Sequence, residues 1–173
     1  MSLIFFKHDL RSACNSDELF EQLRWFLVNH TLHLVFLIRF GQSLGGIPFI
    51  GKVLGLITEY IIRVIYSSDI SLKAKLGKGL VIIHGHDIVI GADVVLGNNC
   101  KIFNGVTLGN KDISLTSKGN QPNVGDNVTL STGSKVLGNV FISNNVVIGA
   151  NSVVLKNCEA HSTYVGIPAR KVR

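Results

Sequence analysis

With 173 residues, the chain is long enough to bury one sizeable core, either as a single domain or as a domain with a small second unit. Its net charge of +6 lies mostly in residues 69–173, where 11 Lys and Arg stand against 6 Asp and Glu. Basic and aromatic residues do not alternate and there is no arginine cluster, which argues against nucleic acid and favours a small polyanion as partner, with scattered solvating charge as the alternative. Three cysteines and no signal-peptide pattern favour a reducing compartment, so we expect a cytoplasmic protein.

Residues 1–68 form the first unit and have the apolar spacing of helices. Asn15 and Glu18 have the spacing of a helix-capping pair, and the apolar residues that follow them share one helical face. These residues are Leu19, Phe20, Leu23, Phe26 and Leu27. A second apolar stretch covers residues 32–44. We expect this N-terminal helical region to be short.

A third apolar stretch follows Pro48 and runs to about Tyr66, and it is hydrophobic enough to suggest a membrane span. Lys52, Glu59 and Arg63 interrupt it, and each costs about 2.5–3.5 kcal/mol in hydrocarbon. We therefore expect helices that pack on each other, on a neighbouring subunit or on a membrane surface. The last alternative would make the protein peripheral at the inner face of the membrane.

Residues 69–173 repeat with a period of six. The aliphatic positions are Ile90, Leu96, Ile102, Leu108, Val124, Leu130, Val136, Ile142, Ile148 and Val154. A helix repeats near 3.6 residues and a strand near 2, so a period of six indicates a parallel β-helix with one flat side per hexapeptide and eighteen residues per coil. The fourth residue after each aliphatic is also small or apolar, which suits a second inward position; Cys100 and Cys158 fall there and are expected in the core.

Two interruptions of this period point to a functional site. Between Ile82 and Ile90 the step is eight residues, so two extra residues must bulge from a coil around His84. Between Leu108 and Val124 sixteen residues replace a multiple of six, so we expect a loop extruded over about residues 109–122. A bulge and a loop on a regular prism are suitable walls for a pocket.

His84 could be a base, a metal ligand or a structural histidine. Asp69 lies fifteen residues upstream, close to one coil, so the two residues can stand on neighbouring rungs about 5 Å apart. An aspartate there would fix the imidazole tautomer and raise its basicity, as a general base for a hydroxyl group requires.

Several motifs of residues 69–173 resemble the serine acetyltransferase branch of the hexapeptide-repeat acyltransferases. The matching segments are Asp69-Ile70, Leu76-Gly77-Lys78-Gly79-Leu80, His84, Ile88-Val89-Ile90-Gly91, Gly105-Val106-Thr107-Leu108-Gly109 and Gly166-Ile167-Pro168-Ala169-Arg170. The segment Leu34–Phe40 with Arg39 also looks like the short helical leader of relatives in surface polysaccharide synthesis. The resemblance is therefore closest in style to polysaccharide-biosynthesis O-acetyltransferases.

This resemblance implies a mainly β fold, a left-handed parallel β-helix, assembled as a homotrimer with acetyl-CoA between adjacent prisms and no metal. It assigns His84 as the general base that deprotonates the acceptor hydroxyl and Asp69 as the residue that orients it. The coenzyme wall maps to Gly109, Asn110, Thr132 and Ala150. Charge alone suggests Lys135, Arg170 and Lys171 for the nucleotide phosphates.

The acceptor half of the site departs from the family pattern. Serine acetyltransferases place an aspartate immediately before the catalytic histidine and an Arg-His-Pro in the extruded loop, whereas this chain has Ile83 and Asn120-Gln121-Pro122. We therefore expect an acetyl-CoA O-acetyltransferase that modifies a hydroxyl of a sugar or glycan precursor in surface polysaccharide biosynthesis. The alternative is a serine O-acetyltransferase of cysteine biosynthesis.

A zinc hydrase of the γ-carbonic anhydrase type is a third hypothesis, since it shares the fold and uses three histidines. Only His84 and His86 lie near each other, and the next histidine is His161. A ligand is missing, which disfavours a metal centre. A purely structural solenoid would leave the bulge at His84 without a purpose.

Overall fold

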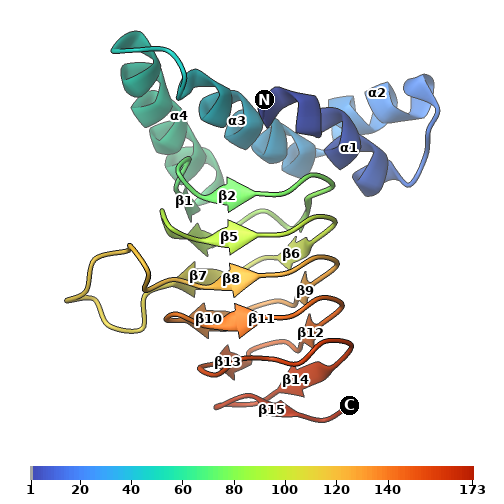
Figure 1. Ribbon diagram of the computed structural model, residues 1–173. Helices are drawn as coiled ribbons and strands as arrows, with labels where there is room; N and C mark the ends of the chain where they lie inside the picture. Colours follow the sequence, from blue (N-terminus) through green and yellow to red (C-terminus); the bar gives the residue numbers. More distant parts are fainter. Residues whose placement is uncertain (1) are drawn as a thin grey trace.

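The computed structural model describes residues 2–173, which form a helical layer on one end of a three-sided prism (Figure 1). The helices are α1 (Ser2–Cys14), α2 (Leu19–Val28), α3 (His30–Leu44) and α4 (Ile50–Tyr66). Helices α2, α3 and α4 correspond to the three apolar stretches of the sequence, whereas α1 was not predicted. Its sequence mixes charged and apolar residues without a clear helical stripe.

The start of α2 differs from the predicted capping pair. Asn15 ends α1 in a left-handed conformation, with φ of 52°, and gives α2 no cap. Instead the Ser16 hydroxyl accepts a hydrogen bond from the Glu18 amide at 3.1 Å, and the Ser16 carbonyl accepts one from the Gln22 side chain at 3.0 Å. The N-cap residue of α2 is Glu18, which makes no side-chain capping hydrogen bond, so the predicted capping pair does not form.

The prism has three flat parallel sheets, which we call faces A, B and C. Face A contains β1 (Asp69–Ile70), β4 (Val89–Ile90), β7 (Thr107–Gly109), β10 (Lys135–Leu137) and β13 (Val153–Val154). Face B contains β2 (Lys75–Leu76), β5 (Val95–Leu96), β8 (Asn123–Val124) and β11 (Phe141–Ile142). Face C contains β3 (Val81–Ile83), β6 (Lys101–Phe103), β9 (Thr129–Leu130), β12 (Val147–Ile148), β14 (Thr163–Val165) and the antiparallel β15 (Arg170–Lys171).

The aliphatic side chains of the six-residue period fill the interior of the prism. Each aliphatic of the repeat stacks on its equivalent in the next rung: on face A, Ile90 pairs with Leu108, Leu108 with Val136 and Val136 with Val154. All four side chains are buried. Cys100 and Cys158 also point inward, and burial raises the pKa of each thiol to about 11. The predicted fold class, a mainly β left-handed β-helix with a short helical region, is confirmed.

Segment 110–122, expected as a loop, contains no strand and projects from the prism between β7 and β8 (Figure 1). The coil keeps its register across this insertion, because Val124 of β8 pairs directly with Leu96 of β5 on the rung above. The Asn110 side chain ties the loop to itself by donating to the Leu115 carbonyl at 2.7 Å.

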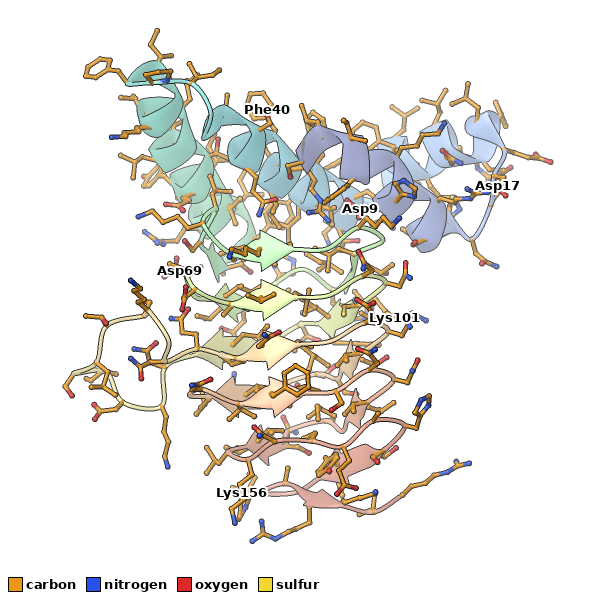
Figure 2. The ribbon with its side chains drawn as sticks, viewed as in Figure 1. Asp9, Asp17, Phe40, Asp69, Lys101 and Lys156 are labelled. Atoms are coloured by element: carbon orange, nitrogen blue, oxygen red, sulfur yellow. The ribbon has the colours of Figure 1, made fainter. Side chains whose placement is uncertain are left out.

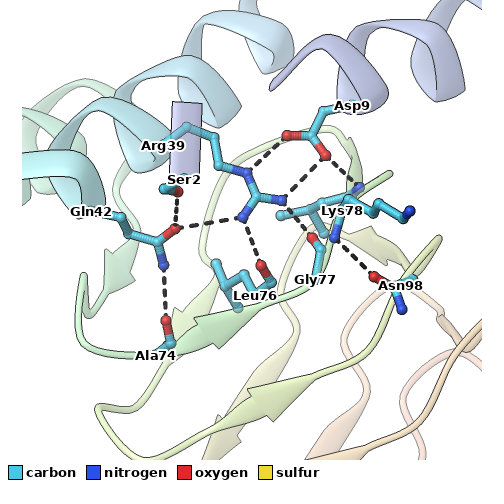
Figure 3. Close-up of polar contacts among 10 residues, drawn as sticks. Ser2, Asp9, Arg39, Gln42, Ala74, Leu76, Gly77, Lys78 and Asn98 are labelled. Carbon is cyan, nitrogen blue, oxygen red and sulfur yellow. Dashed lines mark hydrogen bonds and ion pairs between the residues drawn. The ribbon is translucent and has the colours of Figure 1, made fainter. Parts of the chain in front are cut away.

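A buried ion pair joins the helical layer to the first coil (Figure 3). Arg39 of α3 and Asp9 of α1 are each 0 % exposed, and Arg39 Nε lies 2.8 Å from Asp9 Oδ2. The guanidinium also donates to the carbonyls of Leu76 and Gly77, and the Leu80 amide donates to Asp9 Oδ1. Burial raises the pKa of Asp9, while Arg39 acts in the opposite direction.

Helix α4 presents a broad apolar surface to solvent. Its inner side packs through Thr58, Ile62 and Tyr66, whereas eight large apolar residues on the outer side are exposed. They are Ile50, Val53, Leu54, Leu56, Ile57, Tyr60, Val64 and Ile65. None of the described helices is long and apolar enough to cross a membrane. The expected packing on a neighbouring subunit or on a membrane surface stays a prediction, whereas packing of the helices on each other is observed between α3 and α4.

Candidate active site

His84 stands on a widened corner of the prism. The chain leaves face C at Ile83 and reaches face A at Val89, so five residues make a turn for which the next rung uses only three. His84 and Asp87 both have left-handed backbones, with φ of 56° and 58°, and the His86 amide donates to the His84 carbonyl at 2.7 Å. The predicted two-residue bulge is therefore a tight turn that leaves the His84 side chain exposed.

A buried serine fixes this turn from the side of the helical layer. The Ser68 hydroxyl lies 2.9 Å from the Tyr66 carbonyl and 3.1 Å from the Gly85 carbonyl, and it accepts a hydrogen bond from the Ile88 amide. Gly85 packs against α3 so closely that a Cβ there would stand 2.8 Å from Leu34. Ser68 gave no signal in the sequence, because its partners are backbone atoms that only the fold brings together.

The helical layer also reaches the His84 turn through stacked aromatic rings. The His86 ring lies 5.8 Å from that of His30 and 6.2 Å from that of Tyr66. The Tyr66 hydroxyl in turn donates to the His30 carbonyl at 3.0 Å. The turn that carries His84 is therefore held by α3, by the end of α4 and by Ser68.

The corner of His84 continues down the prism as an edge that we call the C–A edge. The Gly105 amide donates to the His86 carbonyl, the Gly133 amide to the Asn104 carbonyl and the Asn151 amide to the Thr132 carbonyl, at 3.1, 2.9 and 2.9 Å. The structure thus places two of the predicted coenzyme-wall residues, Thr132 and Ala150, on the edge that carries His84. Lys135 reaches this edge too, because its ammonium donates to the Gly105 carbonyl at 2.5 Å.

The predicted orienting residue, Asp69, lies at the start of face A beneath α4 (Figure 2). It pairs in register with Val89, five residues after His84. Its Oδ1 accepts a hydrogen bond from Arg63 at 2.6 Å, which raises the pKa of the Arg63 guanidinium, while its Oδ2 has no partner among residues 2–173. No hydrogen bond joins Asp69 to His84 in the described protomer.

The remaining predicted coenzyme residues lie away from the C–A edge. Gly109 and Asn110 are at the opposite end of the face A strands, and a Cβ on Gly109 would meet no atom within 4 Å, so the backbone there is open to a ligand. Arg170 and Lys171 are on β15 at the far end of face C. Lys171 is bound to Glu159 at 2.6 Å.

Gln121 of the loop has a structural role in the protomer. Its side chain is buried, and its Oε1 accepts a hydrogen bond from the Asp93 amide at 2.8 Å. The amide group also covers Gly91, where a Cβ would come within 2.3 Å of it. The fold therefore uses the Gln121 amide to close the base of the loop.

Within residues 2–173, no group of three or more His, Cys, Asp and Glu side chains could hold a metal ion. A groove of about 690 Å³ lies between α1, α3 and face B, and it contains none of the predicted site residues. The site therefore has an exposed histidine on an ordered turn, with an open edge of the prism below it.

Comparison with known proteins identifies the family. No protein-family model matches the chain. A solved serine acetyltransferase in complex with CoA superposes with a TM-score of 0.84 at 31% identity, over 99% of this chain and 69% of that one. The chain belongs to the serine acetyltransferase family. Soybean serine acetyltransferase complexed with serine gives a TM-score of 0.85 at 31% identity with the same coverage, and the Neisseria gonorrhoeae enzyme gives 0.88 at 30%, over 66% of its length.

Curated serine acetyltransferases match a shorter part of the chain at higher identity. Those of Staphylococcus aureus (strain Mu50) and Staphylococcus epidermidis (strain ATCC 12228) are 47% and 48% identical over 105 and 106 residues, which is 61% of this chain. The chain spans about half the length of these curated relatives, because 48% of each is covered.

These relatives overturn two expectations drawn from the sequence. The acceptor was expected to be a sugar or glycan precursor, and the likeness to be closest to polysaccharide O-acetyltransferases; the matched relatives and structures are serine acetyltransferases. The expected sugar acceptor came from the missing charges at Ile83 and Asn120-Gln121, and the expected likeness to polysaccharide enzymes came from the segment Leu34–Phe40 with Arg39. Charge at two sequence positions is a poor guide to an acceptor when other side chains of the fold reach the same corner.

Proposed function

We propose that this chain is an acetyl-CoA-dependent serine acetyltransferase of cysteine biosynthesis, with His84 as general base. The observation that carries the proposal is the exposed His84 turn on a β-helix that superposes on serine acetyltransferases solved with serine and with CoA. Family resemblance and local geometry agree on the same residue.

The reaction that this site supports is direct acetyl transfer. His84 takes the proton from the acceptor hydroxyl, and the oxygen then attacks the thioester carbonyl carbon. The tetrahedral intermediate collapses with cleavage of the C–S bond, and the imidazolium returns the proton to the leaving thiolate, so the products are the acetyl ester and free CoA. Asp69 serves as the positioning residue, because its Oδ2 stays free to accept the second imidazole N–H while Arg63 holds Oδ1.

For the coenzyme we propose Gly109, Asn110, Thr132 and Ala150 as the wall, with Lys135, Arg170 and Lys171 for the phosphates. Within one protomer these residues fall into three places, the C–A edge, the far end of face A, and β15. Residues so dispersed can line one ligand when a neighbouring prism packs alongside. We therefore propose a homotrimer of about 56 kDa, three times the 18.8 kDa chain. Light scattering that returns an active monomer would contradict the shared site.

The function is tested with purified protein, acetyl-CoA and L-serine, following free thiol release and identifying O-acetylserine by mass spectrometry. His84→Ala should lower turnover by about 100-fold or more while acetyl-CoA binding, measured by calorimetry, persists. His161→Ala is the matched control, because His161 is also exposed and left-handed, with φ of 57°, but lies far down the prism. Wild-type protein that does not acetylate L-serine would refute the proposed function.

A further inference from the structure

An amino-acid acceptor brings charges that a sugar lacks. If the proposed function holds, the ammonium group of serine must be desolvated beside His84, and a buried charge without a partner is costly. The residue before His84 is Ile83, which offers no charge. The carboxylate that meets this ammonium must therefore come from elsewhere on the chain.

Among residues 2–173, few carboxylates are free of a protein partner and so available to bind this ammonium group. The chain has eleven Asp and Glu residues, and nine of them accept a hydrogen bond or an ion pair through their side chains. The nine are Asp9, Asp17, Glu21, Glu59, Asp69, Asp93, Asp112, Asp126 and Glu159. Only Asp87 and Glu18 have no such partner within residues 2–173. Glu18 lies between α1 and α2, far along the chain from the coil, whereas Asp87 lies in the His84 turn.

Asp87 stands on the C–A edge next to the base. It is exposed, and its left-handed backbone closes the turn that begins at His84. One carboxylate oxygen, Oδ2, lies 3.7 Å from the place that a Cβ on Gly105 would occupy, which puts the charge over the rung just below His84. Lys135 also reaches Gly105, through its carbonyl, but forms no ion pair with Asp87.

The left-handed backbone and the unpaired carboxylate of Asp87 cost free energy, which indicates that this residue has a function. Aspartate at positive φ is less favourable than glycine, and an unpaired carboxylate beside a general base gives the fold no hydrogen bond in return. Asn residues occupy the left-handed positions at four other corners of the coil, at Asn99, Asn127, Asn145 and Asn151. A carboxylate here supplies what asparagine cannot, a full negative charge.

We propose that Asp87 binds the ammonium group of the amino-acid acceptor and so replaces the aspartate that is missing at position 83. The proposal rests on the proposed serine acetyltransferase function and names the residue that makes the acceptor site selective for an amino acid. Asp87 is a substrate-binding residue; the proton transfer remains with His84.

The test compares Asp87→Asn with Glu18→Gln, the same neutralisation at the other unpartnered carboxylate. Asparagine tolerates the left-handed backbone, so the turn should keep its shape. Acceptors are L-serine and 3-hydroxypropionate, which has the same hydroxyl and carboxylate but no ammonium, measured both as an alternative acceptor and as a competitive inhibitor. The KM of acetyl-CoA is recorded in each case.

We expect Asp87→Asn to lower kcat/KM for L-serine by about 10- to 100-fold, mostly through KM, since one charge-assisted hydrogen bond is lost. The KM of acetyl-CoA and the constants for 3-hydroxypropionate should not change, and Glu18→Gln should match wild type. Equal losses with both acceptors, or Asp87→Asn behaving like Glu18→Gln, would overturn the proposal alone. If wild-type protein does not use L-serine, the proposed function itself fails.

Discussion

The buried pair of Arg39 and Asp9 makes the sharpest prediction about stability. Asp9→Asn preserves the size of the side chain but removes the only negative charge that contacts the guanidinium within residues 2–173. The carbonyl partners at Leu76 and Gly77 carry no full charge. Because both side chains are 0 % exposed, water cannot replace the lost partner. Breaking a buried ion pair in this way costs about 3–5 kcal/mol.

For a chain of this size, 1 kcal/mol corresponds to about 2–4 °C, so the melting temperature should fall by about 6–20 °C. The measurement is thermal unfolding followed by circular dichroism at one fixed protein concentration, since an oligomer's melting temperature depends on concentration.

The matched control is Asp17→Asn, which breaks the exposed pair of Asp17 with Arg11 at the far end of the helical layer (Figure 2). Exposed pairs contribute about 0–1 kcal/mol, so this variant should unfold close to the wild-type temperature. If the two variants unfold at the same temperature, the reasoning that burial makes the Arg39 pair critical is refuted. An Asp9→Leu, Arg39→Met double variant should lose less than the two single changes added together, because neither charge is then left alone.

Three other predictions follow from the coil. Asp69→Asn should lower turnover less than His84→Ala, since in the proposed mechanism Asp69 orients the base without exchanging its proton; an equal loss in steady-state assays would argue against that role. A thiol reagent at pH 8 should modify only Cys14 in the native chain and all three cysteines after denaturation, because the buried thiols of Cys100 and Cys158 have pKa values of about 11 and also lack access. Gln121→Ala should open the base of the loop and speed its cleavage by trypsin. An unchanged rate of cleavage would show that the hydrogen bond from the Asp93 amide to Gln121 does not hold the loop.

Most of the fold could be predicted from the sequence because the six-residue period governs the whole β-helix. Every sixth residue faces inward, so the positions of Ile90, Leu108, Val136 and Val154 in one stack follow from counting. Helix α1 was not predicted because its stability comes from contacts with α3 and the first coil. Asp9, the residue that fixes it, is charged, and a charged residue would be assigned to the surface from the sequence alone.

Only part of the candidate site could be predicted from the sequence. The break in the period located the His84 turn, since an eight-residue step cannot fit a flat coil. Ser68 and the stacked rings of His30 and His86 could not be inferred, because they come together only when α3 and α4 fold back over the first rung. The acceptor was wrongly predicted because charged residues were sought only at two sequence positions, whereas Asp87, also in the His84 turn, carries a carboxylate.

The extruded loop leaves face A after Gly109 and returns to face B at Asn123 with the stack of rungs undisturbed. Every residue of its tip, 111–116, is exposed, so the tip adds nothing to the apolar interior. The free energy of the coil is therefore nearly independent of the composition of that tip, and closing a longer segment over the same two ends costs only about 0.6 kcal/mol for each doubling in length. Random libraries can be inserted there, or a reporter peptide displayed, while the prism keeps its melting temperature.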